Sequence, residues 1–213
     1  QQNGRGQAVK VIELLKSKEW SGKIVDCALR FALAGALSGA QVFGGYAPLA
    51  LGMTAASGAG VRGLSALVGA SVGAFLFLPF THALRTFAAA VLIFTANNAF
   101  FDLKIYQKRA FLPLLTAGLM FSVEFVYVLR DGVGEAANCL IALLLASLGT
   151  MSARALLAPE EKEQPFAPLL ILLGVLMSAA SYETANGFAP GRILSLLAVL
   201  LCAFERSGAV SVP

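Results

Sequence analysis

Several polar side chains stand inside long apolar stretches of this sequence, and they are the residues whose chemistry needs explaining. They are Arg30, Asn97, Asn98, Asp102, Glu124, Asn138, Glu183 and Asn186. Arg85, Arg130 and Arg192 stand near the ends of the same stretches. Carboxylate and amide oxygens could hold an ion or a polar solute, and within a bilayer such groups otherwise face protein or one another.

We expect these side chains to join helices. By depth along the apolar stretches, Arg30 lies level with Asp102, and Glu124 lies level with Arg85 and Arg130. The sequence therefore predicts an Arg30–Asp102 pair, and a pair between Glu124 and either Arg85 or Arg130. The alternative is a small-solute or ion transporter that uses Asn97, Asn98, Asp102 and Glu124.

No motif of a soluble enzyme accompanies these residues. The sequence has no glycine-rich phosphate loop, nucleophile elbow or zinc signature, and His82 is its single histidine. Cys27, Cys139 and Cys202 lie in or beside apolar runs, which is typical of small buried hydrophobic residues. We therefore expect no catalytic, cofactor-binding or metal-binding residue in this chain.

The composition predicts an all-α, polytopic transmembrane bundle. Hydrophobic residues make up 58% of the 213 residues and charged residues 13%, and the mean hydropathy is +0.77, which points to lipid as the solvent. The net charge of +4 does not indicate nucleic-acid binding, because the basic residues stand at the ends of apolar runs. The clearest run is Ala110–Leu129, whose twenty residues suffice to cross a hydrocarbon core of roughly 30 Å.

The apolar runs predict about eight spans, one of them short or broken. They lie at Ile24–Phe43, Ala47–Ser57, Gly63–Phe80, Thr86–Phe101, Ala110–Leu129, Gly134–Leu157, Phe166–Tyr182 and Gly191–Phe204. The second is too short to cross as one helix unless residues 58–62 continue it, so a half-helix is the other possibility.

The same runs divide the chain into three parts. Residues 24–206 form the membrane domain. Residues 1–23 form a cytoplasmic segment, either an amphipathic helix or a connector. Residues 207–213 begin a truncated continuation, so the chain is expected to be a fragment of a longer protein.

Lysine and arginine in short loops favour the cytoplasmic side. Eight crossings with the N-terminus inside place most of them there and leave Arg85, Arg130 and Arg192 outside. Both termini are then cytoplasmic. If residues 47–57 did not cross, Lys104, Lys108 and Arg109 would move outside and the asymmetry would largely disappear.

Small residues are frequent in the first run, where Gly35, Gly39, Gly44 and Gly45 would let helix backbones approach closely. Residues 33–43 should therefore face protein on at least one side. Surfaces rich in Gly, Ala and Ser also favour self-association in the membrane.

Three stretches resemble the membrane region of the stage II sporulation protein E family. They are Ala36–Gly58 with its turn Gly45-Tyr46-Ala47-Pro48, Thr86–Tyr106 followed by a basic loop, and Gly191–Leu201 ahead of Ser207-Gly208. The resemblance covers roughly residues 36–208.

This resemblance implies a bacterial inner-membrane anchor located at the polar division septum. In the family, the membrane region precedes a segment that engages the division protein FtsZ, and then a manganese-dependent PP2C-type serine/threonine phosphatase. That phosphatase acts on an anti-sigma factor antagonist and so activates the forespore sigma factor. Its manganese-binding aspartates have no counterpart here, so no catalytic residue is carried over. A membrane sensor with an output domain elsewhere is a third, less specific hypothesis.

Overall fold

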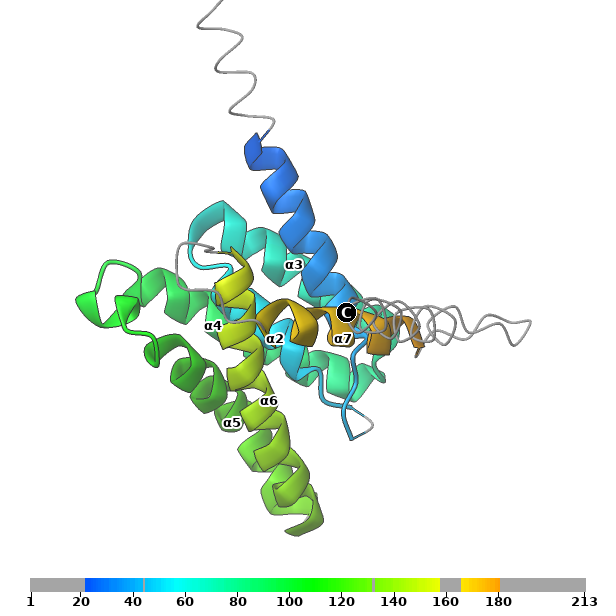
Figure 1. Cartoon of the computed structure of the whole chain (residues 1–213). Coiled ribbons are helices and arrows are strands. Elements are labelled where there is room, and N and C mark those ends of the chain that lie inside the picture. The colour runs from blue at the N-terminus through cyan, green and yellow to red at the C-terminus, as the bar shows by residue number, and fades with distance from the viewer. Residues whose placement is uncertain (1–21, 44, 132, 158–165, 181–213) are drawn as a thin grey trace, which may run out of the picture.

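The described part of the protein is a bundle of helices packed around a short central one (Figure 1). The computed structural model describes residues 22–43, 45–131, 133–157 and 166–180. The helices are residues 22–38, α2 (Pro48–Ala56), α3 (Gly60–Phe77), α4 (Phe80–Phe100), the 3-10 turn η1 (Lys104–Gln107), α5 (Phe111–Asp131), α6 (Val133–Leu157) and α7 (Phe166–Ala180). The prediction of an all-α fold is confirmed for these residues.

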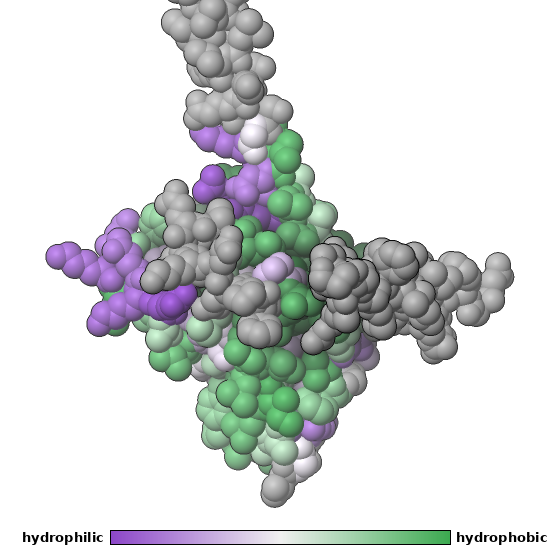
Figure 2. All heavy atoms as spheres, viewed as in Figure 1, coloured by the Kyte–Doolittle hydropathy of each residue, from purple (hydrophilic) through white to green (hydrophobic). Residues whose placement is uncertain are grey.

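Four of these helices, α3 to α6, are long and apolar enough to cross a membrane. Their bounds lie within a few residues of the predicted spans, except at α4, which begins at Phe80 rather than Thr86. Many of their large apolar side chains are exposed, among them Leu76, Leu114, Val126 and Leu144. Figure 2 shows this apolar surface over α5 and α6. The predicted last span, the segment 1–21 and residues 207–213 lie outside the described residues.

The predicted second span is a half-helix. α2 has nine residues, about 13 Å of helix, which is less than half of a hydrocarbon core. Pro48 begins it, where a missing backbone N–H costs nothing. Residues 58–62 do not continue it, because Gly58 and Gly60 have φ values of 76° and 72°, outside the helical region. Eight of its nine residues are buried.

Glycines let the backbones of neighbouring helices touch, as the sequence indicated for Gly35. A Cβ atom on Gly69 would collide with the backbone carbonyl of Phe31, and one on Gly73 would collide with Gly35. Ser38 adds a hydrogen bond at this crossing, since its Oγ donates to the Ala70 carbonyl at 2.9 Å. The helix at 22–38 and α3 are therefore held together by close approach, which is a common device between membrane helices.

A similar contact seats α2 against α6. A Cβ atom on Gly52 would meet the backbone of Gly149 and Thr150, and Leu49, one turn earlier on α2, packs against Gly149. The half-helix is thus enclosed by the longer helices, and its polar ends have to be satisfied by protein groups.

Candidate functional site

The charged side chains of the described part of the bundle lie in two clusters, one at each end. Several elements meet around one cavity at the first end. They are the start of the 22–38 helix, the end of α2, the start of α3, the end of α4, η1, the start of α5 and the end of α6. We call this the arginine end, after Arg30, Arg62 and Arg154. The opposite end contains Glu124 and Glu135, and we call it the glutamate end. The 22–38 helix begins at the arginine end and α2 ends there, so the chain returns to this end through α2 although α2 is short.

At the glutamate end, the predicted pair between Glu124 and Arg85 is confirmed. Arg85 Nη1 donates to Glu124 Oε2 at 3.4 Å, and the two side chains are 13% and 8% exposed. The guanidinium carbon of Arg85 also lies 3.3 Å from the ring centroid of Tyr127. The Arg85 cation is therefore stabilised both by the Glu124 carboxylate and by the face of the Tyr127 ring. The pair joins α4 to α5.

Tyr46 extends this cluster to α6. Its hydroxyl donates to Glu135 Oε2 at 3.2 Å, and its ring meets that of His82 edge to face, with the centroids 6.4 Å apart. Burial, followed by the nearby Glu124 and Glu135 carboxylates, raises the pKa of the Tyr46 phenol well above its usual value. The phenol therefore stays protonated and remains a hydrogen-bond donor.

Near the arginine end, Asn97 and Asn98 hold the turn between α2 and α3. The buried Asn97 donates through Nδ2 to the carbonyl of Ala55, 3.0 Å away in the last turn of α2. Asn98 Oδ1 accepts from the backbone N–H of Gly60, the first residue of α3, at 3.1 Å. Groups at helix ends lack partners within their own helix, so the two amides satisfy one group on each side of the turn.

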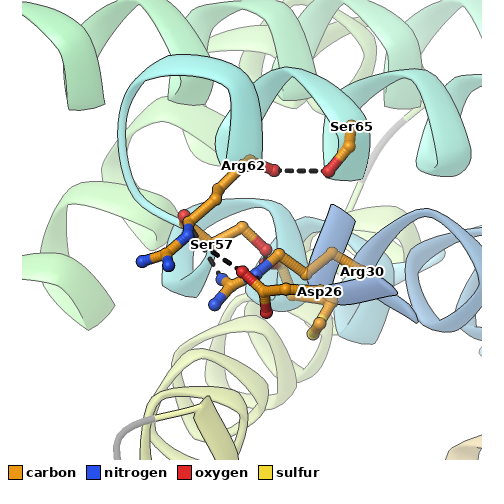
Figure 3. Close-up of polar contacts among 6 residues, drawn as sticks. Asp26, Arg30, Ser57, Arg62 and Ser65 are labelled. Carbon is orange, nitrogen blue, oxygen red and sulfur yellow. Dashed lines mark hydrogen bonds and ion pairs between the residues drawn. The ribbon is translucent and has the colours of Figure 1, made fainter. Parts of the chain in front are cut away.

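Arg30 pairs with Asp26, so the predicted Arg30–Asp102 pair is wrong. Arg30 Nε donates to Asp26 Oδ1 at 3.0 Å, and Arg62 Nε lies 2.9 Å from Asp26 Oδ2 (Figure 3). Arg30 Nη1 also donates to the carbonyl of Ser57 at 3.4 Å. Asp102 is exposed after the end of α4. A carboxylate one helical turn from Arg30 reaches it with less restriction than one on another element.

Sequence reasoning missed Asp26, Arg62, Tyr46 and Glu135. The spacing of Asp26 and Arg30, four residues apart on one helix, was an available signal. No local signal links Tyr46 to Glu135, because 89 positions separate them. Among the other predicted candidates, Asn138 is half-buried on α6, whereas Glu183 and Asn186 lie outside the described residues.

Within the described ranges, no three His, Cys, Asp or Glu side chains gather as a metal site would require. The free Cys139 is buried, and Cys27 is half-buried. Comparison of the chain with protein-family models, curated proteins and solved structures finds no match.

Proposed function

We propose that this chain is a membrane anchor and assembly domain. The observation that carries the proposal is that intramembrane polar side chains are bonded to other helices. Arg85 bonds Glu124 between α4 and α5, and Asn97 and Asn98 bond backbone groups of α2 and α3. Polar groups used in this way stabilise helix packing.

We propose further that the anchored activity is a sporulation phosphatase at the polar septum. This step rests on the likeness of Ala36–Gly58 and Thr86–Tyr106 to the stage II sporulation protein E family. FtsZ, the anti-sigma factor antagonist and manganese would then be partners and cofactor of cytoplasmic parts beyond this membrane region. The chain itself would contribute location in the inner membrane and self-association.

The orientation proposed counts about eight spans, the short α2 among them, and puts the arginine end in the cytoplasm. Lys104, Lys108 and Arg109 lie in or beside η1, whose Tyr106 shares a pocket with Arg62 and Arg154. Arg85 belongs to the opposite cluster. This grouping supports the charge asymmetry expected of a cytoplasmic face.

A transporter is the second candidate, and α2 is the observation that favours it. Buried half-helices often form solute sites near the bilayer midplane. Asn97 Oδ1 is also buried and has no hydrogen-bond partner among the described residues. An ion could use that oxygen.

The test combines localisation with flux. Residues 1–213 fused to a fluorescent protein should collect at the polar septum of sporulating cells, and a uniform membrane signal would contradict the septal anchor. In proteoliposomes, the anchor proposal expects no uptake of ions or small solutes above that of empty vesicles. Uptake that Asn97→Leu abolishes without unfolding the protein would establish the transporter instead.

A further inference from the structure

At the glutamate end, the residues that lead into α2 lie against His82, near the start of α4. The imidazole meets the Tyr46 ring edge to face. The backbone of Gly45 lies directly against the Nδ1 edge of the imidazole, because a Cβ atom on Gly45 would overlap Nδ1 and the neighbouring ring atoms. Gly45, Tyr46 and Ala47 are all buried. The start of α2 therefore packs on a side chain that can change its charge near neutral pH.

Tyr46 ties this segment to α6 and to the turn before it. Its hydroxyl donates to Glu135. Its backbone N–H donates to the Val42 carbonyl at 3.1 Å, and its carbonyl accepts from the Val42 N–H at 2.9 Å. Phe43, which follows Val42, has a φ of 51°, a left-handed conformation that is uncommon for an aromatic residue. The contacts of Tyr46 therefore offset an unfavourable backbone conformation at Phe43.

The packing of His82 suits the neutral ring. No hydrogen bond joins His82 to another described residue, and a protonated imidazole has two N–H donors that each need an acceptor. Its Nδ1 edge faces the Gly45 backbone, which offers no acceptor there. Arg85 lies one helical turn along α4 and repels a second positive charge. The nearby Glu135 carboxylate attracts such a charge, but it already accepts from Tyr46.

The two effects act in the same direction. A protonated ring is pushed away from Arg85 and Gly45 and drawn toward Glu135, where it competes with the Tyr46 hydroxyl for the carboxylate. Protonation of His82 therefore weakens the contacts that hold the start of α2 on α4 and α6.

Other groups at this end also carry charge or titrate. They are Tyr46, Arg85, Glu124, Tyr127, Arg130, Glu135 and Cys139. Among the described side chains of this end, His82 is the one whose unperturbed titration lies between pH 5 and 8. Glu124 and Glu135 are the groups that an experiment has to separate from it.

We propose that His82 is a pH-sensitive switch for the start of α2. Above about pH 7 the neutral ring packs against Gly45 and Tyr46, and Tyr46 stays bonded to Glu135. Below about pH 6 the protonated ring turns toward Glu135 and releases Tyr46 with the residues that lead into α2. The inference does not rest on the anchor function. In the orientation proposed above, the glutamate end faces outside, so the proton comes from outside the cell.

Hydrogen–deuterium exchange of the full chain in lipid nanodiscs tests the switch. The amides of Val42 and Tyr46 are protected by their mutual hydrogen bonds, and each exchange rate is compared with the intrinsic rate at the same pH. From about pH 7.5 to about pH 5.5, their protection should fall roughly tenfold in the native protein and less than about twofold in His82→Gln. Equal losses in both proteins would overturn the proposal, and so would unchanged protection in the native protein.

An amide at the other end of α2 separates local release from unfolding of the bundle. The N–H of the buried Ser57 is bonded to the Met53 carbonyl at 3.0 Å, and its protection should be the same at both pH values. If it fell together with that of Tyr46, acid would be loosening the whole bundle and the local switch would be disproved.

A second histidine variant guards against a folding defect. His82→Phe keeps an aromatic ring against Tyr46 and has no nitrogen to protonate, so protection of Tyr46 should again be independent of pH. Thermal unfolding of every variant at neutral pH is measured first. A pH dependence in His82→Phe as large as that of the native protein would contradict the proposal.

Tyr46→Phe imitates the released state. It removes the bond to Glu135 and keeps the ring on His82, so the Val42 amide should show at neutral pH the low protection that the native protein reaches in acid. Native protection in Tyr46→Phe at neutral pH would show that the bond does not hold the segment, and the proposal would fail.

Glu135→Gln separates the histidine from the carboxylate. The amide oxygen still accepts from Tyr46 but cannot titrate, and it attracts a protonated ring less strongly. The acid-induced loss of Tyr46 protection should therefore be smaller than in the native protein. A loss that persists in His82→Gln and vanishes in Glu135→Gln would assign the switch to the carboxylate and contradict the role of His82.

Discussion

Asn97 donates its side-chain N–H to the carbonyl of Ala55 across 3.0 Å, and through this bond a long helix holds the end of a half-helix. The next residue, Asn98, accepts from the N–H of Gly60 on the other side of the turn. The two asparagines of the last turn of α4 therefore supply the donor and the acceptor that the backbone of the α2–α3 turn needs. In the sequence, the same pair resembles a solute site.

Replacing Asn97 should destabilise the bundle. Asn97→Leu keeps the volume similar and leaves the Ala55 carbonyl without its partner in a buried setting, which should lower the free energy of unfolding by about 1–2 kcal/mol. Equilibrium unfolding in mixed detergent micelles measures it. The control is Asn138→Leu, at a half-buried asparagine of α6 with no hydrogen bond to the described residues. Equal losses in both variants would argue against the helix-end role.

The crossing of the 22–38 helix and α3 depends on the absence of a side chain at Gly69. Gly69→Ala would push a Cβ atom into the Phe31 carbonyl. Backbone groups have little room to yield, so we expect a loss of about 1–3 kcal/mol. Gly118→Ala is the matched control, because a Cβ atom on Gly118 meets nothing within 4 Å and alanine favours the helix by up to about 1 kcal/mol. If Gly69→Ala were as stable as Gly118→Ala, the close contact between the 22–38 helix and α3 would be disproved.

The Arg85–Glu124 pair should behave as a coupled unit. Glu124→Gln leaves the mostly buried Arg85 without its counter-charge, which typically costs about 3–5 kcal/mol. Removing both charges with Arg85→Gln and Glu124→Gln together should cost less than the sum of the single losses. A double-mutant cycle in micelles measures this coupling. Additive losses would show that the pair does not join α4 to α5, and normal folding of Glu124→Gln with altered solute uptake would favour transport.

Much of the helix pattern follows from the apolar runs, because a bilayer demands long helices whose backbone groups are satisfied internally. The bounds of α5 and α6 were therefore predictable to within a few residues. The length of α2 was less predictable. Its end depends on the left-handed conformations of Gly58 and Gly60, and glycines in a small-residue run do not reveal whether they continue a helix or stop it.

Side-chain partners were predictable only where depth left few choices. Depth in the membrane offered Glu124 two partners, Arg85 and Arg130, and the structure shows Arg85. Depth also placed Arg30 beside Asp102, but the i,i+4 carboxylate of Asp26 was closer. The roles of Asn97 and Asn98 required the position of the α2–α3 turn, which no local pattern supplies.

The two ends of the bundle should label from opposite sides of the membrane. Phe43, beside the glutamate end, is 47% exposed, and Ile105, in η1 at the arginine end, is 45% exposed. With Cys27, Cys139 and Cys202 replaced by serine, Phe43→Cys should react with a membrane-impermeant maleimide in intact cells. Ile105→Cys should react only after the cells are opened, and so should a cysteine at position 160, in the predicted loop between the sixth and seventh spans. If the cysteines at positions 105 and 160 were labelled in intact cells and Phe43→Cys were not, the orientation would be the reverse of the one proposed. If Phe43→Cys and Ile105→Cys were both labelled from the same side, residues 44–57 would not carry the chain across the membrane. Reaction of both only in opened cells would leave the glutamate end inside as well, which the positive-inside distribution of Arg62, Lys104 and Arg154 does not predict.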